Sequence, residues 1–418
     1  MSDLQERLDE VEARGLSRRL RVVSSAQGPR VTLDGRPVLL LCSNDYLGLA
    51  GHTRVRAAAA EAAERWGAGA GSSRLVSGNM APHAELEARL AAFKGTEAAL
   101  LFGSGYLANL GVVSSLAGAG EVVFSDALNH ASIIDGCRLA RAETFVYRHA
   151  DVEHLAWGLR QAGDRGGVIV TDGVFSMDGD VAPLEEIVAL ARDHGCRVVV
   201  DEAHATGALG PGGRGSVAAA GLDGEPDIVV VGTLGKALGS YGAYVCCDEL
   251  TRRFLVNTAR PLIFSTGLPP AVVVAALTAL DLLEAEPRMV ARLRANATCL
   301  REALAREGFE GAASSTQIVP LVVGDAAAAV AMAEVALEQG VFAQAIRPPT
   351  VPEGTSRLRL AVMATHTRNE LREAAGVLAR AAARAGVKPT TDVPDPAAAA
   401  RPGAVVALEP GRARVHAA

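Results

Sequence analysis

The segment Val198-Val199-Val200-Asp201-Glu202-Ala203-His204 passes from an apolar run straight into charged side chains. β-branched residues favour strands, and a short apolar run without alternation is typical of a strand buried on both faces. In parallel α/β sheets, ligands bind beyond the carboxyl ends of the strands. The segment therefore predicts a buried strand that ends at a ligand site.

Similar apolar runs recur on either side of this segment, separated by stretches with helical spacing. Strand-like runs occupy residues 98–102, 122–124, 168–171 and 228–231, and helices are predicted over 82–93, 105–116 and 184–194. Strands that alternate with helices imply a mostly parallel sheet covered on both faces. The predicted fold class is therefore α/β.

The rest of the chain divides into smaller units. Apolar residues at helical spacing predict an amphipathic helix over residues 3–20, and Asp34-Gly35-Arg36-Pro37 predicts a hairpin turn. After a long helix near 270–285, strands at 318–323 and 357–362 and helices at 326–339 and 368–383 predict an α+β unit. The predicted domains are an N-terminal helix and hairpin segment (1–48), a large domain (49–285), a small C-terminal domain (286–386) and a disordered tail rich in Pro, Ala and Gly (387–418).

Composition and charge exclude several classes of protein. The 418 residues are 49% hydrophobic and 21% charged, which is typical of a globular protein, and a net charge of −6 provides no basic field for nucleic acid. The N-terminus lacks the apolar region of a secretory signal, and the longest apolar stretch, 271–280, is too short to cross a bilayer. Six cysteines show no C-x-x-C pair or zinc-like spacing. We therefore expect a cytoplasmic protein without a metal site or a membrane partner.

Lysine is rare in this chain, and one lysine lies in a sequence context that suits catalysis. Of the 41 basic residues only Lys94, Lys236 and Lys388 are lysines. Lys94 is expected in a polar turn, and Lys388 lies in the Pro-rich tail. Lys236 lies between glycines in Gly235-Lys236-Ala237-Leu238-Gly239, just after the strand at 228–231. A primary amine can form a Schiff base with a carbonyl group, whereas the guanidinium of arginine cannot. Lys236 is therefore the candidate for covalent chemistry, and an exposed turn lysine is the alternative.

Two further strand ends carry groups that would suit a flat, phosphorylated cofactor. Gly103-Ser104-Gly105-Tyr106 opens a helix, and free N–H groups at a helix start suit a phosphate. Asp201 can pair with a pyridinium nitrogen, and His204 can donate to a phenolic oxygen of the ring. Thr233, three residues before Lys236, can bond the same phosphate. Together these groups predict pyridoxal 5′-phosphate (PLP) held by Lys236; a tight turn and a helix-capping aspartate remain the simpler alternatives.

The letters Asp201-Glu202-Ala203-His204 also occur in ATP-driven helicases, where the carboxylates bind magnesium. That interpretation requires a phosphate loop of the form G-x-x-x-x-G-K-[ST]. Gly235-Lys236 is followed by Ala237, and Val230 stands where the leading glycine should be. An acidic chain without this loop does not favour a nucleotide motor.

Two more loops follow strands. Asn129-His130-Ala131-Ser132 can place an imidazole against a planar ring, although a lone histidine is more often structural. Asp172, Ser176, Met177 and Asp178 lie after the strand at 168–171. Ser176 is a candidate hydroxyl partner of the cofactor, and a turn former is the equally good alternative.

Taken together, these segments resemble the α-oxoamine synthase family of fold-type I PLP enzymes over residues 1–385. The strings that carry the resemblance are Ser43-Asn44-Asp45-Tyr46-Leu47-Gly48-Leu49 and residues 125–135, 171–179, 201–207 and 232–239. The resemblance implies a large domain with a mostly parallel seven-stranded sheet and a smaller α+β domain. It also implies an obligate homodimer with shared active sites.

The resemblance assigns roles residue by residue. Lys236 would form the Schiff base, Asp201 would pair with the pyridinium, His130 would stack on the ring, and Ser176 and His204 would approach its phenolic side. Gly105, Tyr106 and Thr233 would hold the phosphate, and Thr266 would reach the phosphate of the neighbouring subunit. Arg359 would clamp the amino-acid carboxylate beside Asn44, and Arg21 and Thr350 would contact the acyl substrate.

The implied reaction is a decarboxylative condensation of an amino acid with an acyl thioester. Residues 264–270 and 346–352 favour L-alanine and a pimeloyl thioester of CoA or an acyl carrier protein. A relative that joins glycine to acetyl-CoA fits residues 125–130 equally well, and a PLP-fold binding protein without catalysis is the non-enzyme alternative. Retention of both Lys236 and Asp201 argues against the latter.

Overall fold

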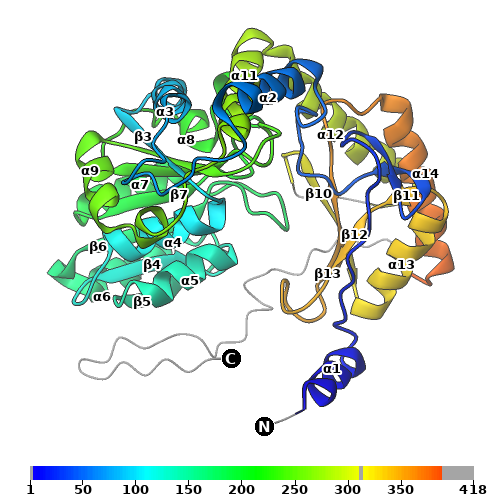
Figure 1. Cartoon of the computed structure of the whole chain (residues 1–418). Helices are drawn as coiled ribbons and strands as arrows, with labels where there is room; N and C mark the ends of the chain where they lie inside the picture. The colour runs from blue at the N-terminus through cyan, green and yellow to red at the C-terminus, as the bar shows by residue number, and fades with distance from the viewer. Residues whose placement is uncertain (1–2, 310–313, 388–418) are drawn as a thin grey trace.

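The computed structural model contains a seven-stranded sheet in the order β3-β9-β8-β7-β6-β4-β5 (Figure 1). It describes residues 3–309 and 314–387. The strands are β3 (Ala98–Phe102), β4 (Val122–Asp126), β5 (Glu143–Tyr147), β6 (Gly167–Asp172), β7 (Arg197–Asp201), β8 (Ile228–Thr233) and β9 (Ala243–Cys247). Strands β4 to β8 pair in parallel, whereas β9 is antiparallel to both β3 and β8. The prediction of a mostly parallel α/β sheet is confirmed.

Alternate residues of the strands face two separate hydrophobic cores. In β7, Val198 and Val200 belong to one core, whereas Val199 belongs to the other. The first core includes α3 (Ala81–Lys94), α6 (Val152–Ala162), α7 (Leu184–Asp193) and α11 (Pro270–Ala285). The second includes α4 (Gly105–Leu116), α5 (Ala131–Leu139), α9 (Glu249–Thr258) and α10 (Arg260–Ile263). Because both faces are covered, the valine run carries no polar residue, and each buried valine contributes roughly 1.5–3 kcal/mol.

A second lobe, which we call the C-terminal lobe, is built on two three-stranded sheets. β10 (Ile318–Gly324), β13 (Ser356–Ala361) and β12 (Gln344–Ile346) form an antiparallel sheet. The helices α12 (Arg288–Arg306), α13 (Ala326–Glu338) and α14 (Arg368–Arg384) share a core with it. The predicted hairpin is present as β1 (Arg30–Leu33) and β2 (Arg36–Leu40), and β2 pairs in parallel with β11 (Val341–Phe342). The N-terminal hairpin is therefore part of this lobe.

The remaining elements are short or lie between the lobes. They are α1 (Leu4–Ala13), α2 (Thr53–Trp66), α8 (Ser216–Ala219) and 3₁₀ turns at Gly163–Arg165 and Pro211–Gly213. α2 packs against α11, and both lie at the junction of the lobes (Figure 1). α1 is shorter than the predicted helix over 3–20, because Gly15 adopts a φ of 64° that ends the helix. The predicted disordered tail lies, apart from Val387, outside the described residues, and the domain boundaries remain a prediction.

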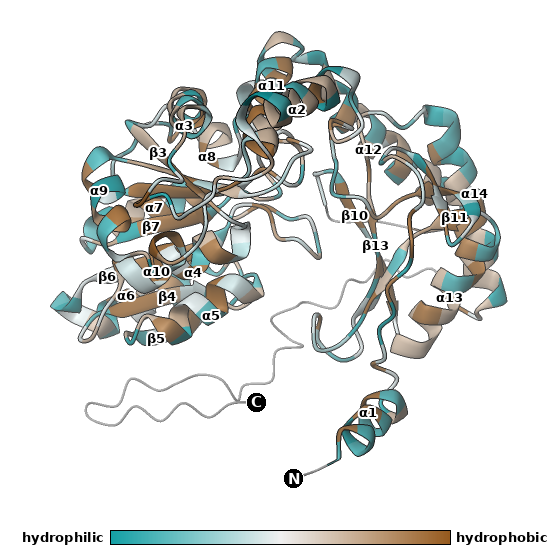
Figure 2. Cartoon of the chain, in the orientation of Figure 1, coloured by the Kyte–Doolittle hydropathy of each residue, from teal (hydrophilic) through white to brown (hydrophobic). Residues whose placement is uncertain are grey.

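Figure 2 shows hydrophobic residues concentrated in the strands of both lobes and hydrophilic residues on the outer helices. This distribution follows from the two-faced burial of the large sheet. Across residues 3–309 and 314–387, no helix combines the length and the apolar character that crossing a bilayer demands.

Lys94 is buried, so its predicted place in a polar turn was wrong. It is the last residue of α3, and its side chain is 3% exposed. Its Nζ donates to the Glu202 carboxylate and, at 2.8 Å, to the Thr206 hydroxyl. Burial tends to lower the pKa of Lys94, but the Glu202 charge outweighs it and holds that pKa above its usual value. Glu202 is therefore occupied by a structural ion pair, which leaves no role for it as a magnesium ligand.

Replacing Lys94 with methionine is expected to destabilise the protein by about 3–5 kcal/mol, because the Glu202 charge would stay buried without its partner. Chemical denaturation would measure this loss. The double variant Lys94→Met/Glu202→Gln should recover part of it. Arg306→Ala, which removes an exposed ion pair with Glu302, is the control and should change stability by less than about 1 kcal/mol. A single variant as stable as the wild type would contradict the structural role.

Candidate active site

Lys236, His204 and Asp201 meet at the carboxyl ends of β7 and β8. Asp201 is the last residue of β7, and Lys236 follows β8 by three residues. The Nζ of Lys236 lies 2.9 Å from Nε2 of His204. On its other side, Nδ1 of His204 lies 2.5 Å from the hydroxyl of Tyr46. The amine thus lies inside the protein, at the predicted strand ends.

The surroundings of Lys236 shift its amine toward the neutral, nucleophilic form. Burial lowers its pKa, the charges of Asp201 and Asp172 partly oppose this effect, and the result is a pKa of about 8. The pKa of His204 is held well below its ordinary value, first by burial and then by the charge of Lys236. An amine with a pKa near neutral pH suits both covalent attachment and proton transfer.

Asp201 is held by a residue that the sequence analysis does not name. Its Oδ2 accepts a hydrogen bond of 2.6 Å from Nδ2 of Asn109 on α4, and its Oδ1 accepts one of 2.8 Å from the backbone N–H of Ala203. Asn109 is fully buried in an otherwise apolar stretch of the helix. That lone polar residue, four positions after Gly105, was the available sequence signal.

The N-terminus of α4 lies against the end of β8. Gly105 is the first residue of α4, and a Cβ built on it would lie 4.0 Å from Cβ of Thr233. The free N–H groups of this helix start, together with a threonine hydroxyl, form a suitable cradle for a phosphate. Tyr106 is 40% exposed, and its hydroxyl donates to the carboxylate of Asp135.

His130 is the N-cap residue of α5; the residue keeps some access to solvent, but its imidazole is partly buried, with Nδ1 against the buried Ser132 hydroxyl. Its backbone N–H donates to Oδ2 of Asp172 at 2.8 Å. Burial and the nearby Lys236 charge lower the pKa of His130, while Asp201 opposes them. The imidazole is therefore neutral near pH 7 and free to contact a planar ligand.

Ser176 lies on the loop between β6 and α7, which an ion-pair cluster holds in place. His149 bridges Asp126 and Asp180, with Nδ1 and Nε2 at 3.0 Å and 2.8 Å from the two carboxylates. Burial tends to lower the pKa of His149, but these carboxylates raise it to about 10, so the ring is charged. It also packs edge-on against Phe175, with ring centroids 4.4 Å apart. The cluster fixes the base of the loop that carries Ser176.

Arg359 is a buried cation with no acidic partner among the described residues. It lies on β13 with 7% exposure. Its guanidinium donates to the carbonyl of Ser176, to Oδ1 of Asn44 at 3.1 Å and to the hydroxyl of Tyr46 at 3.3 Å. A buried charge without a counter-ion is costly, so this geometry favours an anionic ligand.

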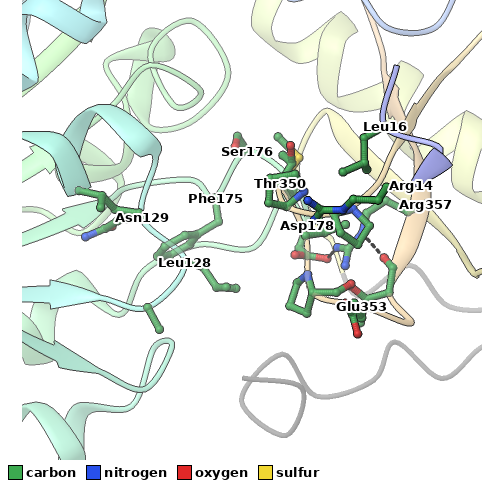
Figure 3. Close-up of a pocket in the computed structure, with 18 residues that line it drawn as sticks. Arg14, Leu16, Leu128, Asn129, Phe175, Ser176, Asp178, Thr350, Glu353 and Arg357 are labelled. Atoms are coloured by element: carbon green, nitrogen blue, oxygen red, sulfur yellow. Dashed lines mark hydrogen bonds and ion pairs between the residues drawn. The ribbon is translucent and has the colours of Figure 1, made fainter. Parts of the chain in front are cut away.

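A pocket of about 470 Å³ lies between the two lobes (Figure 3), and its lining includes Ser176, whose carbonyl accepts a hydrogen bond from Arg359. One wall carries Leu128, Asn129 and Phe175, and the other carries Thr350 and Arg357. Most of the lining is apolar or proline-rich, and Ser176 is one of its polar members. A pocket of this kind suits an extended acyl chain next to a polar reaction centre.

Two residues predicted to contact ligands, Arg21 and Thr266, do not lie beside Lys236 or line the pocket. Arg21 pairs with Glu334 at 2.5 Å and is not among the residues that line the pocket. Thr266 is exposed, and its backbone forms an isolated antiparallel β-bridge with Ser73. Within the described residues, no group of three or more histidine, cysteine, aspartate or glutamate side chains could hold a metal ion.

The residues present fit PLP. A buried amine, a carboxylate held by hydrogen bonds and a helix start facing Thr233 supply the three contacts that its aldehyde, ring nitrogen and phosphate need. With the sheet described above, this site defines a fold-type I PLP-dependent transferase.

The chain belongs to the aminotransferase class I and II family, whose model matches residues 36–378. It is 51% identical over 390 residues to an 8-amino-7-oxononanoate synthase of Citrifermentans bemidjiense, covering 93% of this chain and 100% of that one. It is 54% identical over 359 residues to the synthase of Anaeromyxobacter dehalogenans, covering 86% and 90%.

Solved structures agree with these sequence relatives. A serine palmitoyltransferase variant from S. paucimobilis with bound PLP matches with a TM-score of 0.87 and 36% identity, covering 92% of this chain and 100% of that one. An 8-amino-7-oxononanoate synthase of Francisella tularensis matches with a TM-score of 0.72 and 27% identity, covering 83% and 98%. The resemblance to the α-oxoamine synthases is confirmed.

The titration of Lys236 can be tested directly. In the protein free of PLP, the labelling rate of its amine by an acylating reagent should rise with pH around a midpoint of about 8, because the neutral amine reacts. Mass spectrometry would follow labelling of the Lys236 peptide. Nα-acetyllysine in the same solution, whose side-chain amine is free, would give the pH dependence of an unperturbed lysine. A midpoint that coincides with that of Nα-acetyllysine would refute the lowered pKa.

Proposed function

We propose that this protein condenses L-alanine with a pimeloyl thioester to give 8-amino-7-oxononanoate, CO₂ and the free thiol, a step of biotin biosynthesis. The observation that carries the proposal is that the Lys236 amine lies close enough to the Asp201 carboxylate and the Arg359 cation for both charges to shift its pKa, while Arg359 has no acidic partner among the described residues. Relatives named for this reaction cover nearly the whole chain.

In this proposal, Gly105, Tyr106 and Thr233 bind the phosphate of PLP, and Asp201 pairs with its ring nitrogen. His130 stacks on the ring, and Ser176 and His204 approach its oxygen. When bound, the cofactor supplies an electron sink for the charge left on the amino-acid Cα. These roles are supported by the strand-end positions of the residues and by the hydrogen bond that fixes Asp201.

Lys236 and Arg359 act on the amino acid. Arg359 binds the alanine carboxylate through its guanidinium, beside Asn44. Lys236 takes the Cα proton, which requires the neutral amine that its lowered pKa provides. His204, 2.9 Å from the amine, holds it at the site. The deprotonated Cα then attacks the thioester carbonyl, the C–S bond breaks and the thiol leaves. The alanine carboxylate departs as CO₂, and Cα regains a proton, which the Lys236 ammonium can return.

The acyl thioester occupies the pocket between the lobes in this proposal, with Thr350 in its wall. A volume of about 470 Å³ is large enough for a pimeloyl chain. Arg21 is proposed as a further acyl contact, which it could make only by leaving its ion pair with Glu334. The thiol is that of CoA or of an acyl carrier protein.

We further propose a cytoplasmic homodimer with shared active sites. In the dimer, Thr266 of the partner subunit would reach the phosphate. Exposed apolar side chains near Thr266 support a contact surface there: Leu75, Val76 and Phe264 are 52%, 79% and 71% exposed. All six cysteines are free thiols, which is consistent with a reducing compartment.

Turnover with defined substrate pairs tests the proposed function. Alanine and glycine would each be combined with acetyl and pimeloyl thioesters of CoA and of acyl carrier protein, and thiol and CO₂ release would be measured. We expect alanine with a pimeloyl thioester to give the highest kcat/KM, and Lys236→Ala to abolish turnover. Preference for glycine and acetyl-CoA would instead favour a glycine C-acetyltransferase, and full activity of Lys236→Ala would end the proposal.

Arg359→Lys should raise the KM for alanine by about 10- to 100-fold, because an ammonium cannot replace the two-pronged contact of a guanidinium with a carboxylate. Steady-state kinetics at saturating thioester would measure it, and the KM for the thioester should change little. The exposed Arg380 on α14 provides the matched control, Arg380→Lys. An unchanged alanine KM would place the carboxylate elsewhere.

A further inference from the structure

A chain of hydrogen bonds links His130 to Asp201 beneath the proposed cofactor site. Nδ2 of Asn109 donates to Oδ2 of Asp201 at 2.6 Å and to Oγ of Ser132 at 2.9 Å. The Ser132 hydroxyl in turn lies 2.7 Å from Nδ1 of His130. Asn109 and Ser132 are both completely buried, so water does not compete for these bonds.

The direction of each bond follows from the donors available. A carboxylate only accepts, so the NH₂ side of the Asn109 amide must face Asp201. Its second hydrogen then goes to Ser132, whose oxygen becomes an acceptor. The hydroxyl hydrogen of Ser132 is left for Nδ1 of His130. The backbone N–H of Ser132 also donates to that nitrogen, at 3.3 Å, as the cap of α5.

The side-chain carbonyl oxygen of Asn109 makes no use of its buried position, unlike the side-chain NH₂ group. Its Oδ1 is buried without a hydrogen-bond partner among the described residues. Leaving such an oxygen unpaired is unfavourable, so an apolar residue of similar size would avoid this cost. The amide is therefore retained for its two donors, which point at Asp201 and Ser132.

We propose that Asn109 and Ser132 are positioning residues that hold His130 as the neutral tautomer protonated on Nε2. The hydroxyl and the backbone N–H of Ser132 both point at Nδ1 of His130. A proton on Nδ1 would therefore be repelled by the hydrogens of these two donors. Nε2 makes no hydrogen bond to any described residue, and its proton is free for a bound group. His130 is then a hydrogen-bond donor to the carbonyl oxygen of the acyl substrate and not a general base.

This inference deepens the proposed function, because it assigns the base to Lys236 alone and gives His130 a donor role. The lowered pKa of His130 agrees with the bond directions, since protonating Nδ1 would break both of its contacts. The same chain fixes Asp201, so one amide orients the two groups that would lie against the cofactor ring.

Solid-state NMR of the PLP-bound protein labelled with ¹⁵N-histidine would read the tautomer directly. The His130 signals would be identified by their loss in His130→Gln. We expect Nδ1 to be unprotonated and Nε2 protonated in the wild type. Ser132→Ala should give a mixture of tautomers and lower kcat by about five- to tenfold, with the KM for alanine nearly unchanged.

Two further variants separate positioning from folding. Ser115→Ala removes a buried hydroxyl of α4 that has no hydrogen-bond partner in the described part of the chain, and it should change neither the spectrum nor kcat. Asn109→Leu, which keeps the size of the side chain but removes its donors, should reproduce the tautomer mixture. The double variant Asn109→Leu/Ser132→Ala should be no slower than the slower single variant, because both act through one chain.

A proton on Nδ1 in the wild type, or an unchanged tautomer in a folded Ser132→Ala, would overturn the inference. Thermal midpoints and PLP absorbance would establish that each variant is folded and loaded. If the wild type turned over no alanine with any thioester, the proposed function would fail while the tautomer result would stand on its own.

Discussion

The site is organised by buried carboxylates at the ends of neighbouring parallel strands. Asp172 on β6 and Asp201 on β7 are register partners, and both are nearly inaccessible to water. Burial, followed by the charge of Asp201, raises the pKa of Asp172 well above its usual value. Two like charges cannot be buried side by side without compensation. The Lys236 amine, the Asn109 amide and the backbone N–H groups of His130 and Ala203 provide it.

Buried polar groups in this protein fall into two kinds. Lys94 and Glu202 are satisfied by each other and by Thr206 and Ser216, so they stabilise the fold. Arg359 has hydrogen bonds but no counter-ion in the described chain, and Lys236 is near carboxylates without a direct ion pair. Arg359 and Lys236 can therefore still form ion pairs with a ligand, which distinguishes the site from the rest of the interior.

The loop after β6 couples the two lobes to the site. His149 holds its base to the large sheet, while Arg357 and Arg359 of β13 contact Asp178 and the carbonyl of Ser176. Gly179 has a φ of 71°, and a Cβ there would lie 2.5 Å from Oγ of Ser314. The C-terminal lobe therefore packs directly against backbone at this point, and the pocket wall depends on that close fit.

Sequence alone determined the strands whose apolar runs are unbroken, such as 198–201, because burial on both faces leaves such runs. It also predicted the helix at 105–116, which the glycine-rich turn after a strand opens. It further predicted site roles for Lys236, Asp201 and His204, which lie at or just after strand ends, whereas the role of Arg359 came only from the family resemblance. It did not identify β9, an antiparallel strand with no helix before it, or the burial of Lys94, because a charged residue gives no sign of a distant partner.

Only the tertiary structure brought Asn109 to Asp201, Tyr46 to His204 and Arg21 to Glu334. These contacts join residues 92, 158 and 313 positions apart, and chain packing rather than local preference sets such distances.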